Sequence, residues 1–307
     1  MSKESETETD GSGAVEAVAS EGRSGPEGPV GRELTAGVTM LATAVALISV
    51  LVGALLAAVS LTGHVFGAWT SPEPLSPGLV GAAMVGVAPG LFVIGRARVW
   101  EEVRTLVLPL ALVLVGLLAV TLLNAGRLQA AEGGSLVLVL FSLGWVAVLG
   151  LLGMAAVGCL VGQYLKPARP RGGRIAPLPG WSKPFLAVLG SAWSGIGAGL
   201  LALPDFWAGF VPWTVNRPDA QALGVWALSL GVGVLGALAE DDLTRIRPAL
   251  LALPCVALAV TLELGAHAST VHWSSGPGLS LITMVGGLLL AGGVGRLLLS
   301  RQAGLRP

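Results

Sequence analysis

The sequence predicts an all-α integral membrane protein whose eight transmembrane helices form two parallel four-helix repeats. Hydrophobic residues make up 53% of the 307 positions and charged residues only 12%, a composition that excludes a soluble globular domain. Eight apolar runs are long enough to span a bilayer. Several motifs occur twice in the same order, which indicates a duplicated unit.

The apolar runs define the predicted helices. The first run is too long for the apolar region of a signal peptide and no short charged segment precedes it, so it predicts an uncleaved transmembrane helix. The eight predicted helices cover residues 36–61, 78–94, 106–123, 136–161, 185–203, 220–238, 249–264 and 279–299.

The positive residues test this helix count independently. Short cytoplasmic loops of membrane proteins retain Lys and Arg, and sixteen of the eighteen Lys and Arg residues here fall in alternate loops, leaving only Arg127 and Arg217 on the other side. A missed or additional helix would destroy this alternation. The sequence therefore predicts a cell-membrane protein with both termini in the cytoplasm.

The repeat consists of two matching copies, residues 66–122 and residues 210–262. Each copy opens on a Phe-x-x-Trp-Thr turn, containing Trp69 or Trp213, and each ends on the string Leu-Ala-Val-Thr-Leu. Because each predicted repeat holds an even number of helices, the two halves should share one membrane orientation.

These elements divide the chain into five predicted regions. Residues 1–35 are acidic and lack apolar periodicity, which predicts a disordered cytoplasmic tail. A Pro/Gly-rich basic linker at 164–184 cannot hold a helix and separates the repeats at 36–163 and 185–299, and a cytoplasmic C-terminus covers 300–307. The linker's positive residues are typical of a topology determinant, with attraction of anionic lipid headgroups as the alternative.

Small residues and aromatics predict packing. Glycines one helical turn apart, at Gly86/Gly90, Gly158/Gly162 and Gly195/Gly199, are typical of close helix contacts inside a membrane, and a homodimer face is the alternative.

The aromatic segment 206–213 predicts a short helix in the outer interface, and Trp69 and Trp273 are assigned to the same aromatic belt. An aromatic-lined binding mouth is the alternative for this segment.

Two sets of acidic residues and arginines lie on the predicted cytoplasmic side. The sets are Glu101, Glu102 and Arg104 in the first half, and Asp241, Asp242 and Arg245 in the second. Carboxylates at a helix start favour capping of free backbone N–H groups, and an arginine three residues later favours pairing on one helix face. The alternative is a cytoplasmic ion or lipid-headgroup site where the two sets meet.

A second candidate cluster lies on the predicted outer side. Glu263 is the one carboxylate well inside an apolar run, His267 lies one helical turn further, and His272 and His64 belong to the same side. Three interpretations stay open. The cluster is a set of hydrogen-bonded side chains at the interface, a proton-linked or polar gate, or a zinc site. The residue types suffice for zinc, but they lack a close metal-ligand spacing.

Motifs for enzymatic chemistry are missing from the sequence. It contains no His-Glu-x-x-His, no Cys-x-x-Cys and no Gly-x-Ser-x-Gly. Cys159 and Cys255 lie in apolar runs, where a small soft side chain packs well and a disulfide framework is not expected. We expect no cofactor, no resident metal and no nucleic-acid partner.

The second half also carries a family resemblance. Pro212-Trp213-Thr214, Ala222-Leu223-Gly224-Val225-Trp226 and the Asp241-Asp242-x-x-Arg245-x-Arg247 loop resemble a group of uncharacterised bacterial multi-pass membrane proteins. In this chain the first Trp of the group's Trp-Pro-Trp turn is replaced. The resemblance covers about 60 residues and implies no activity.

The sequence thus favours a non-enzymatic membrane protein, either transporter-like or an accessory subunit of a membrane complex. Duplicated halves favour transport, whereas the scarcity of charge inside the helices argues against it. A structural or assembly partner is the first alternative, and an enzyme acting on a lipid or headgroup at the outer face is the second. Expected partners are the bilayer and an unidentified membrane protein or a second copy of the chain.

Cysteine labelling tests the predicted topology. Single cysteines on the outer side should react with an impermeant thiol reagent added to intact cells, in a background lacking Cys159 and Cys255, and cysteines at Ala97 or Gly173 should not. The outer positions are Ser71, Ala131, Asn216 and Ser274. The reverse pattern would contradict the topology.

Overall fold

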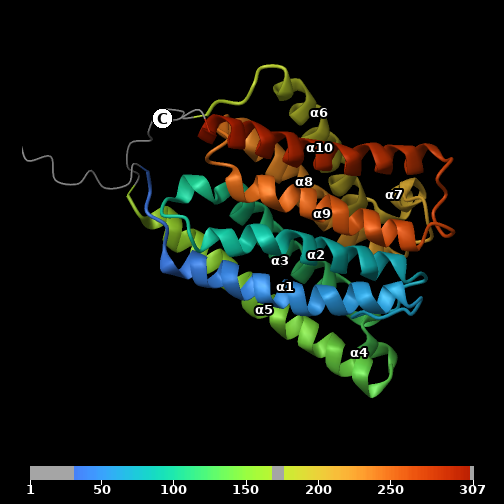
Figure 1. Ribbon diagram of the computed structural model, residues 1–307. Helices are drawn as coiled ribbons and strands as arrows, with labels where there is room; N and C mark the ends of the chain where they lie inside the picture. Colours follow the sequence, from blue (N-terminus) through green and yellow to red (C-terminus); the bar gives the residue numbers. More distant parts are fainter. Residues whose placement is uncertain (1–30, 168–175, 305–307) are drawn as a thin grey trace, which may run out of the picture.

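The computed structural model describes residues 31–167 and 176–304, and Figure 1 shows these residues as a bundle of long helices. Most of the predicted acidic tail, the centre of the predicted linker and the last three residues lie outside this range. Across the described ranges, extended backbone pairs only at two isolated bridges. Eight helices are long and apolar enough to cross a membrane, so the all-helical prediction and the helix count are confirmed.

Each long helix corresponds to one predicted apolar run, and most of the helices extend beyond their run. For example, α5 ends at Leu165 and α8 begins at Arg217, because polar residues continue the helix where it leaves the apolar layer. The long helices are α1 (Ala36–Leu61), α2 (Leu75–Ile94), α3 (Arg104–Leu123), α5 (Leu136–Leu165), α6 (Ser182–Ala202), α8 (Arg217–Glu240), α9 (Arg247–Ala266) and α10 (Gly276–Gly304).

Five short helical segments connect the long ones. They are η1 (Trp100–Glu102), η2 (Ala125–Arg127), α4 (Gln129–Glu132), α7 (Pro204–Trp207) and η3 (Ala208–Phe210). The last two form the short helical stretch that the aromatic spacing predicts, with the Trp207 and Phe210 ring centroids 5.3 Å apart. Phe206 is largely exposed there, as expected for a side chain at a lipid interface.

At one end of the bundle the described structure includes residues that the sequence assigns to the tail and the linker. The backbone N–H of Thr35 donates to Gln163 Oε1 at 3.0 Å, and Gln163 Nε2 donates to the carbonyl of Glu33 at 2.9 Å. The carbonyl of Ala176 accepts the N–H of Leu243 at 2.7 Å. Residues 31–35 and 176–181 are therefore packed against the helices.

The long helices lie in two layers that mix the two halves of the sequence. In one layer α1 packs on α2, α2 on α9 and α9 on α10, and Figure 1 shows these four in a row. In the other layer α5 packs on α3, α3 on α8 and α8 on α6. The strongest partner of α2 after α1 is therefore α9, a helix of the other half.

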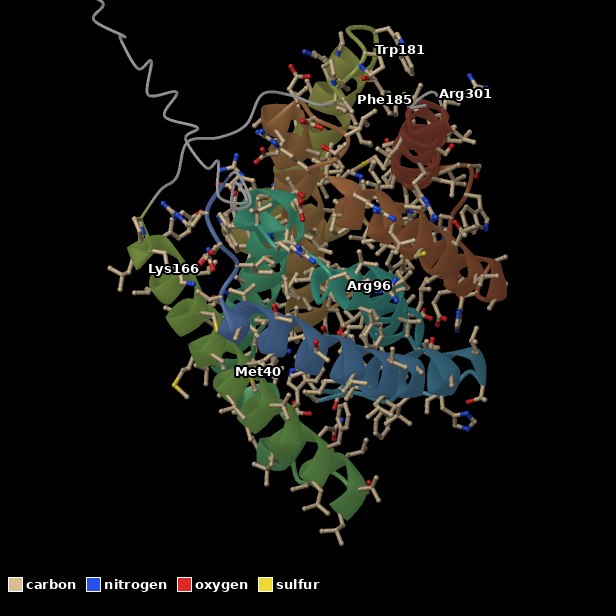
Figure 2. All side chains as sticks on the ribbon, turned by 60° about the vertical axis from the view of Figure 1, so that its left-hand side comes forward. Met40, Arg96, Lys166, Trp181, Phe185 and Arg301 are labelled. Atoms are coloured by element: carbon tan, nitrogen blue, oxygen red, sulfur yellow. The ribbon has the colours of Figure 1, made fainter. Side chains whose placement is uncertain are left out.

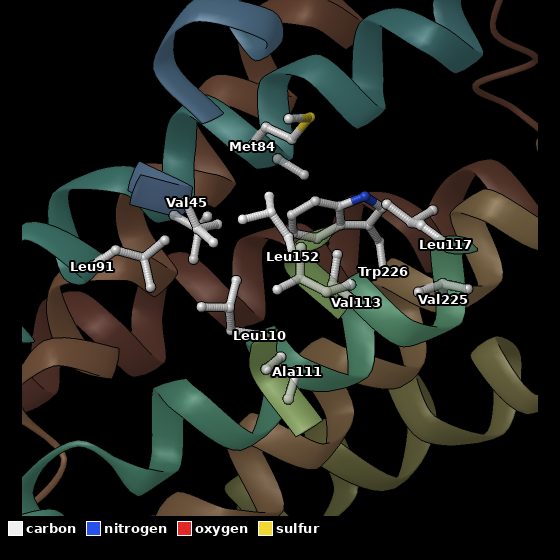
Figure 3. Close-up of a cluster of buried hydrophobic side chains, with 14 of the residues drawn as sticks. Val45, Met84, Leu91, Leu110, Ala111, Val113, Leu117, Leu152, Val225 and Trp226 are labelled. Atoms are coloured by element: carbon white, nitrogen blue, oxygen red, sulfur yellow. The ribbon is translucent and has the colours of Figure 1, made fainter. Parts of the chain in front are cut away.

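Each half has its own apolar core. The larger cluster joins α1, α2, α3 and α5, and Trp226 of α8 enters it among Val45, Met84 and Leu152 (Figure 3). A second cluster joins α6, α8, α9 and α10 around Trp193. Trp226 thus connects the first core to a helix of the second half.

Glycines allow the close helix contacts within each layer. A Cβ on Gly86 would overlap the backbone at Val256 of α9, and one on Gly90 would lie 2.8 Å from the Pro248 carbonyl oxygen. The Gly86/Gly90 packing prediction is confirmed. Gly53 and Gly81 lie against one another's backbone between α1 and α2 in the same way, because small residues let backbones approach where lipid offers no hydrophobic drive.

The other two glycine motifs do not form intramolecular contacts between long helices, and that prediction is wrong. Nothing lies within 4 Å of a Cβ built on Gly158, Gly162 or Gly195, because these positions face outward from α5 and α6. Gly199 lies against the indole of Trp207 instead. The alternative of a homodimer face stays a prediction.

The glycine contacts predict a matched pair of substitutions. Gly86→Val should lower the free energy of unfolding in detergent by about 1–3 kcal/mol, because the new side chain overlaps the α9 backbone and forces the helices apart. Gly158→Val should leave stability unchanged within error, since its side chain enters open space. Equal stabilities of the two variants would show that α2 and α9 do not meet at this contact.

Candidate functional site

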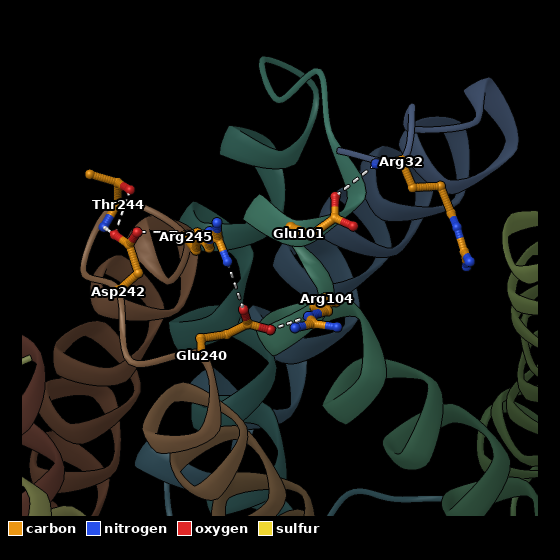
Figure 4. A network of polar contacts seen from close by, with 7 residues as sticks. All are labelled: Arg32, Glu101, Arg104, Glu240, Asp242, Thr244 and Arg245. Atoms are coloured by element: carbon orange, nitrogen blue, oxygen red, sulfur yellow. Dashed lines mark hydrogen bonds and ion pairs between the residues drawn. The ribbon is translucent and has the colours of Figure 1, made fainter. Parts of the chain in front are cut away.

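Glu240, the last residue of α8, is buried, and its carboxylate contacts two arginines at the starts of other long helices. Arg104, the first residue of α3, donates its Nε–H to Glu240 Oε1. Arg245, which lies just before α9, places Nη1 4.0 Å from Glu240 Oε2 (Figure 4). One carboxylate therefore joins the starts of α3 and α9 to the end of α8.

The second predicted acid/arginine set surrounds this carboxylate. Asp242 is fully buried and accepts hydrogen bonds from the backbone N–H of Thr244 at 2.9 Å and from its hydroxyl at 2.6 Å. Its Oδ2 lies 3.7 Å from Arg245 Nε, the predicted pairing at a spacing of three residues. Asp241 accepts from Lys183 Nζ at 2.7 Å. These carboxylates thus hold the turn between α8 and α9.

The first predicted set is arranged differently. Glu101 lies in η1 and accepts the backbone N–H of Arg32 at 3.0 Å, so it fixes the segment before α1 rather than capping α3. Arg104 pairs with Glu240, not with Glu101. Glu102 is half-exposed and makes no side-chain hydrogen bond or ion pair with a described residue. The two sets therefore meet through Glu240, which the sequence analysis missed although it immediately precedes Asp241.

A buried carboxylate also lies at the opposite end of the bundle, in α9. Glu263 is 2% exposed, and its Oε1 has no hydrogen-bond partner among the described residues. This oxygen and the Ser60 hydroxyl both lie directly against Gly78 of α2. The single hydroxyl proton of Ser60 is donated to the Pro74 carbonyl at 2.8 Å, so the Ser60 oxygen can accept a hydrogen bond from a protonated Glu263 but cannot also donate one to it.

His267, at the end of α9, covers this carboxylate. Its Nδ1 lies 3.1 Å from the Glu263 carbonyl oxygen and 3.8 Å from Glu263 Oε1, and its Nε2 lies 3.1 Å from the Ser60 carbonyl oxygen. Both ring nitrogens therefore face acceptors. A neutral imidazole has one N–H and only the imidazolium has two, so this geometry fits the charged ring beside a carboxylate.

The other two histidines of the predicted outer cluster do not join this pair. His64 is exposed and its Nδ1 contacts the Thr62 carbonyl at 3.0 Å. His272 contacts the Pro212 carbonyl at 3.0 Å. Within residues 31–167 and 176–304 no three His, Cys, Asp or Glu side chains are grouped to hold a metal ion, so the structure gives no support to the zinc alternative.

Asp219, near the start of α8, is a second buried carboxylate at this end. Its Oδ1 accepts hydrogen bonds from Trp69 Nε1 and from the Ser71 hydroxyl, both at 2.8 Å, while Oδ2 has no partner among the described residues. Trp69 is buried, so its assignment to a lipid-facing aromatic belt is wrong. Ser71 is buried too, which makes it a poor site for thiol labelling.

A small cavity lies beside Asp219. Its volume is about 30 Å³, and Ser71, Ser76 and Trp69 contribute to its lining. Most of its surface is apolar, and Asp219 is one of its lining residues.

A reciprocal contact connects the two halves next to this cavity. Trp69 of the first half donates to Asp219 at the start of α8, and Trp213 of the second half donates to Ser76 at the start of α2 at 3.0 Å. Both tryptophans are repeat markers in the sequence, but no sequence pattern indicated their partners. Asp219 lies just before the apolar run, where no pattern distinguishes a buried acid from an exposed one.

Comparison with known proteins adds no assignment: no protein-family model, no curated protein and no solved structure matches this chain.

The ion-pair network predicts a large effect of one substitution. Glu240→Ala should lower the free energy of unfolding in detergent by about 3–5 kcal/mol, because it leaves the partly buried guanidinium of Arg104 without its carboxylate. The control Glu102→Ala should change stability little, since that side chain makes no contact of this kind. Equal effects in a denaturation series would contradict the network.

Proposed function

We propose that this protein is a non-enzymatic, transporter-like protein of the cell membrane, with two parallel four-helix repeats and both termini in the cytoplasm. Its functional centre is the Glu263–His267 pair, which takes up protons from the outer side and couples them to movement between the halves. The observation that carries this proposal is a buried carboxylate whose Oε1 lacks a hydrogen-bond donor in the described part of the chain and which lies between helices of different halves.

Helix packing supports the parallel repeat. When α1, α2, α3 and α5 are matched in order with α6, α8, α9 and α10, each contact in one layer has an equivalent in the other. The α1–α2 contact corresponds to α6–α8, the α2–α9 contact to α8–α3, and the α3–α5 contact to α9–α10. A two-fold axis along the membrane normal produces this correspondence.

Individual residues support the same relation. The exchanged contacts of Trp69 and Trp213 are equivalent under it, since each indole donates to the start of the matching helix in the other half. Both α3 and α9 contain an internal proline, Pro109 and Pro254. The two tryptophans belong to the string matches that suggested the repeat, but their hydrogen-bond partners and the two prolines do not.

Positive side chains support the orientation. Arg96, Lys166 and Arg301 lie at the end of the bundle that comes forward in Figure 2. Arg96 follows α2, Lys166 follows α5 and Arg301 lies in α10. The bacterial and eukaryotic rule that positive residues are retained inside assigns this end to the cytoplasm. Glu263 and His267 then belong to the outer end.

The chemistry of the pair supports proton uptake. An imidazolium at His267 and a carboxylate at Glu263 form a neutral ion pair, whereas a further proton on Glu263 leaves a positive charge in a buried site. The Ser60 hydroxyl oxygen lies close enough to Gly78 and Glu263 to accept a hydrogen bond from the protonated carboxyl group. Because Ser60 is on α1, Gly78 on α2 and Glu263 on α9, the proton changes contacts between the halves.

An accessory role in a membrane complex is the competing function. The tight contacts at Gly86, Gly90, Gly53 and Gly81 favour it, because they leave no wide polar passage between α1 and α2 or between α2 and α9. The two functions differ in whether the outer end opens when protons bind.

Thiol accessibility at different pH values tests the proposal. Leu264→Cys places a thiol on a buried position next to Glu263, in a background lacking Cys159 and Cys255. Its labelling rate, divided by that of an exposed Ser274→Cys control at the same pH, should rise about tenfold from roughly pH 8 to roughly pH 5.

The added substitution Glu263→Gln should abolish this rise without lowering the yield of folded protein, because an amide cannot change charge. A normalised rate that is independent of pH in the otherwise native background would remove the proton-linked function and leave the accessory role. A pH-dependent rate that persists in Glu263→Gln would assign the response to another group.

A further inference from the structure

A second apolar cavity lies at the cytoplasmic end of the second half, between α6, α8, α9 and α10. Its volume is about 230 Å³, which exceeds the roughly 150 Å³ cavity that holds a benzene ring. Its lining is aliphatic and aromatic, with Trp181 and Phe185 from the start of α6 and Val294 and Leu298 from α10. Trp181 is 66% exposed, so the cavity has an accessible edge.

Two exposed arginines stand at the cytoplasmic edge of this cavity. Arg301 lies one helical turn beyond Leu298 on α10, and Arg247 lies one turn before the lining residue Leu250 on α9. Gly295 packs directly against Leu250, so at about 1.5 Å per residue the two arginines differ in height by only about 5 Å. Figure 2 shows Arg301 at the same end as Trp181 and Phe185.

These arginines are available to a ligand, unlike their neighbours. Lys183 is engaged by Asp241, and Arg245 lies beside Glu240 and Asp242. Neither Arg247 nor Arg301 forms an ion pair with a described residue. The cavity is therefore an apolar chamber with an unneutralised cationic edge.

We propose that this cavity binds an anionic glycerophospholipid of the inner leaflet, with one acyl chain among the α6 and α10 side chains and the phosphate at Arg247 and Arg301. Charge complementarity selects this occupant, because arginine donates paired N–H groups to phosphate oxygens. A neutral or zwitterionic lipid fills the chamber equally well but gains less at the edge. This proposal does not depend on the proton-linked function.

The first half supplies an internal comparison. Its cavity, about 260 Å³, is lined at mid-depth by α1, α3 and α5, by side chains such as Val45, Leu114 and Trp145. No Lys or Arg belongs to the pocket or lies within one helical turn of its lining residues. This cavity has room for an acyl chain but offers no Lys or Arg at its edge to bind a headgroup.

Fluorescence quenching by brominated lipids tests the proposal on the full-length protein in nanodiscs. The quenching due to Trp181 is obtained by subtracting the fluorescence quenching of the Trp181→Phe variant from that of the native protein. Brominated phosphatidylglycerol should occupy the site with roughly tenfold preference over brominated phosphatidylcholine, because each arginine near the surface contributes several-fold. Arg247→Gln with Arg301→Gln should abolish the preference.

Matched variants separate a site from general attraction. Arg96→Gln with Arg98→Gln removes two exposed positive charges at the same end in the first half and should keep the preference. Val294→Phe should reduce quenching by both lipids, whereas Gly144→Val in the first cavity should not. Equal quenching by the two lipids in the native protein, or equal losses in both arginine pairs, would overturn the proposal.

Discussion

Helices in a bilayer gain little from burying apolar side chains against one another, since lipid is as apolar as the helices. Close backbone contact must therefore supply much of the packing energy. Gly86 and Gly90 provide it between α2 and α9, and Gly53 and Gly81 provide it between α1 and α2. The layered arrangement depends on this constraint, because bulkier residues at these points would separate the layers' central helices.

The two halves pack into one another because two of these glycines, on α2, lie against α9, which belongs to the other half. Because α2 packs on α9 and α8 on α3, the buried carboxylates lie where helices of different halves meet. Glu240 pairs with two arginines, which stabilises its end of the bundle. At the opposite end, Glu263 and Asp219 each keep one oxygen without a hydrogen-bond donor among the described residues.

Apolar runs predicted all eight helices, because each span needs a continuous hydrophobic segment whatever its neighbours are. The pairing of Glu263 with His267 was also predictable, since it is local in the sequence. Asp219 and Glu240 were missed because each lies at the edge of an apolar run and is buried only by contacts with Trp69 or Arg104, far away in the chain. Gly158 looked like Gly86 for the same reason: spacing does not reveal which face of a helix meets a partner.

Disulfide formation between α3 and α8 tests the interlocked arrangement most directly. A Cβ on Gly116 would lie 3.6 Å from Val225 Cβ, within the range that a disulfide requires. Gly116→Cys with Val225→Cys, in a background lacking Cys159 and Cys255, should therefore cross-link on mild oxidation in native membranes. The bond should join fragments of different halves after proteolysis between them. Failure to cross-link, while the folded yield is unchanged, would contradict the account.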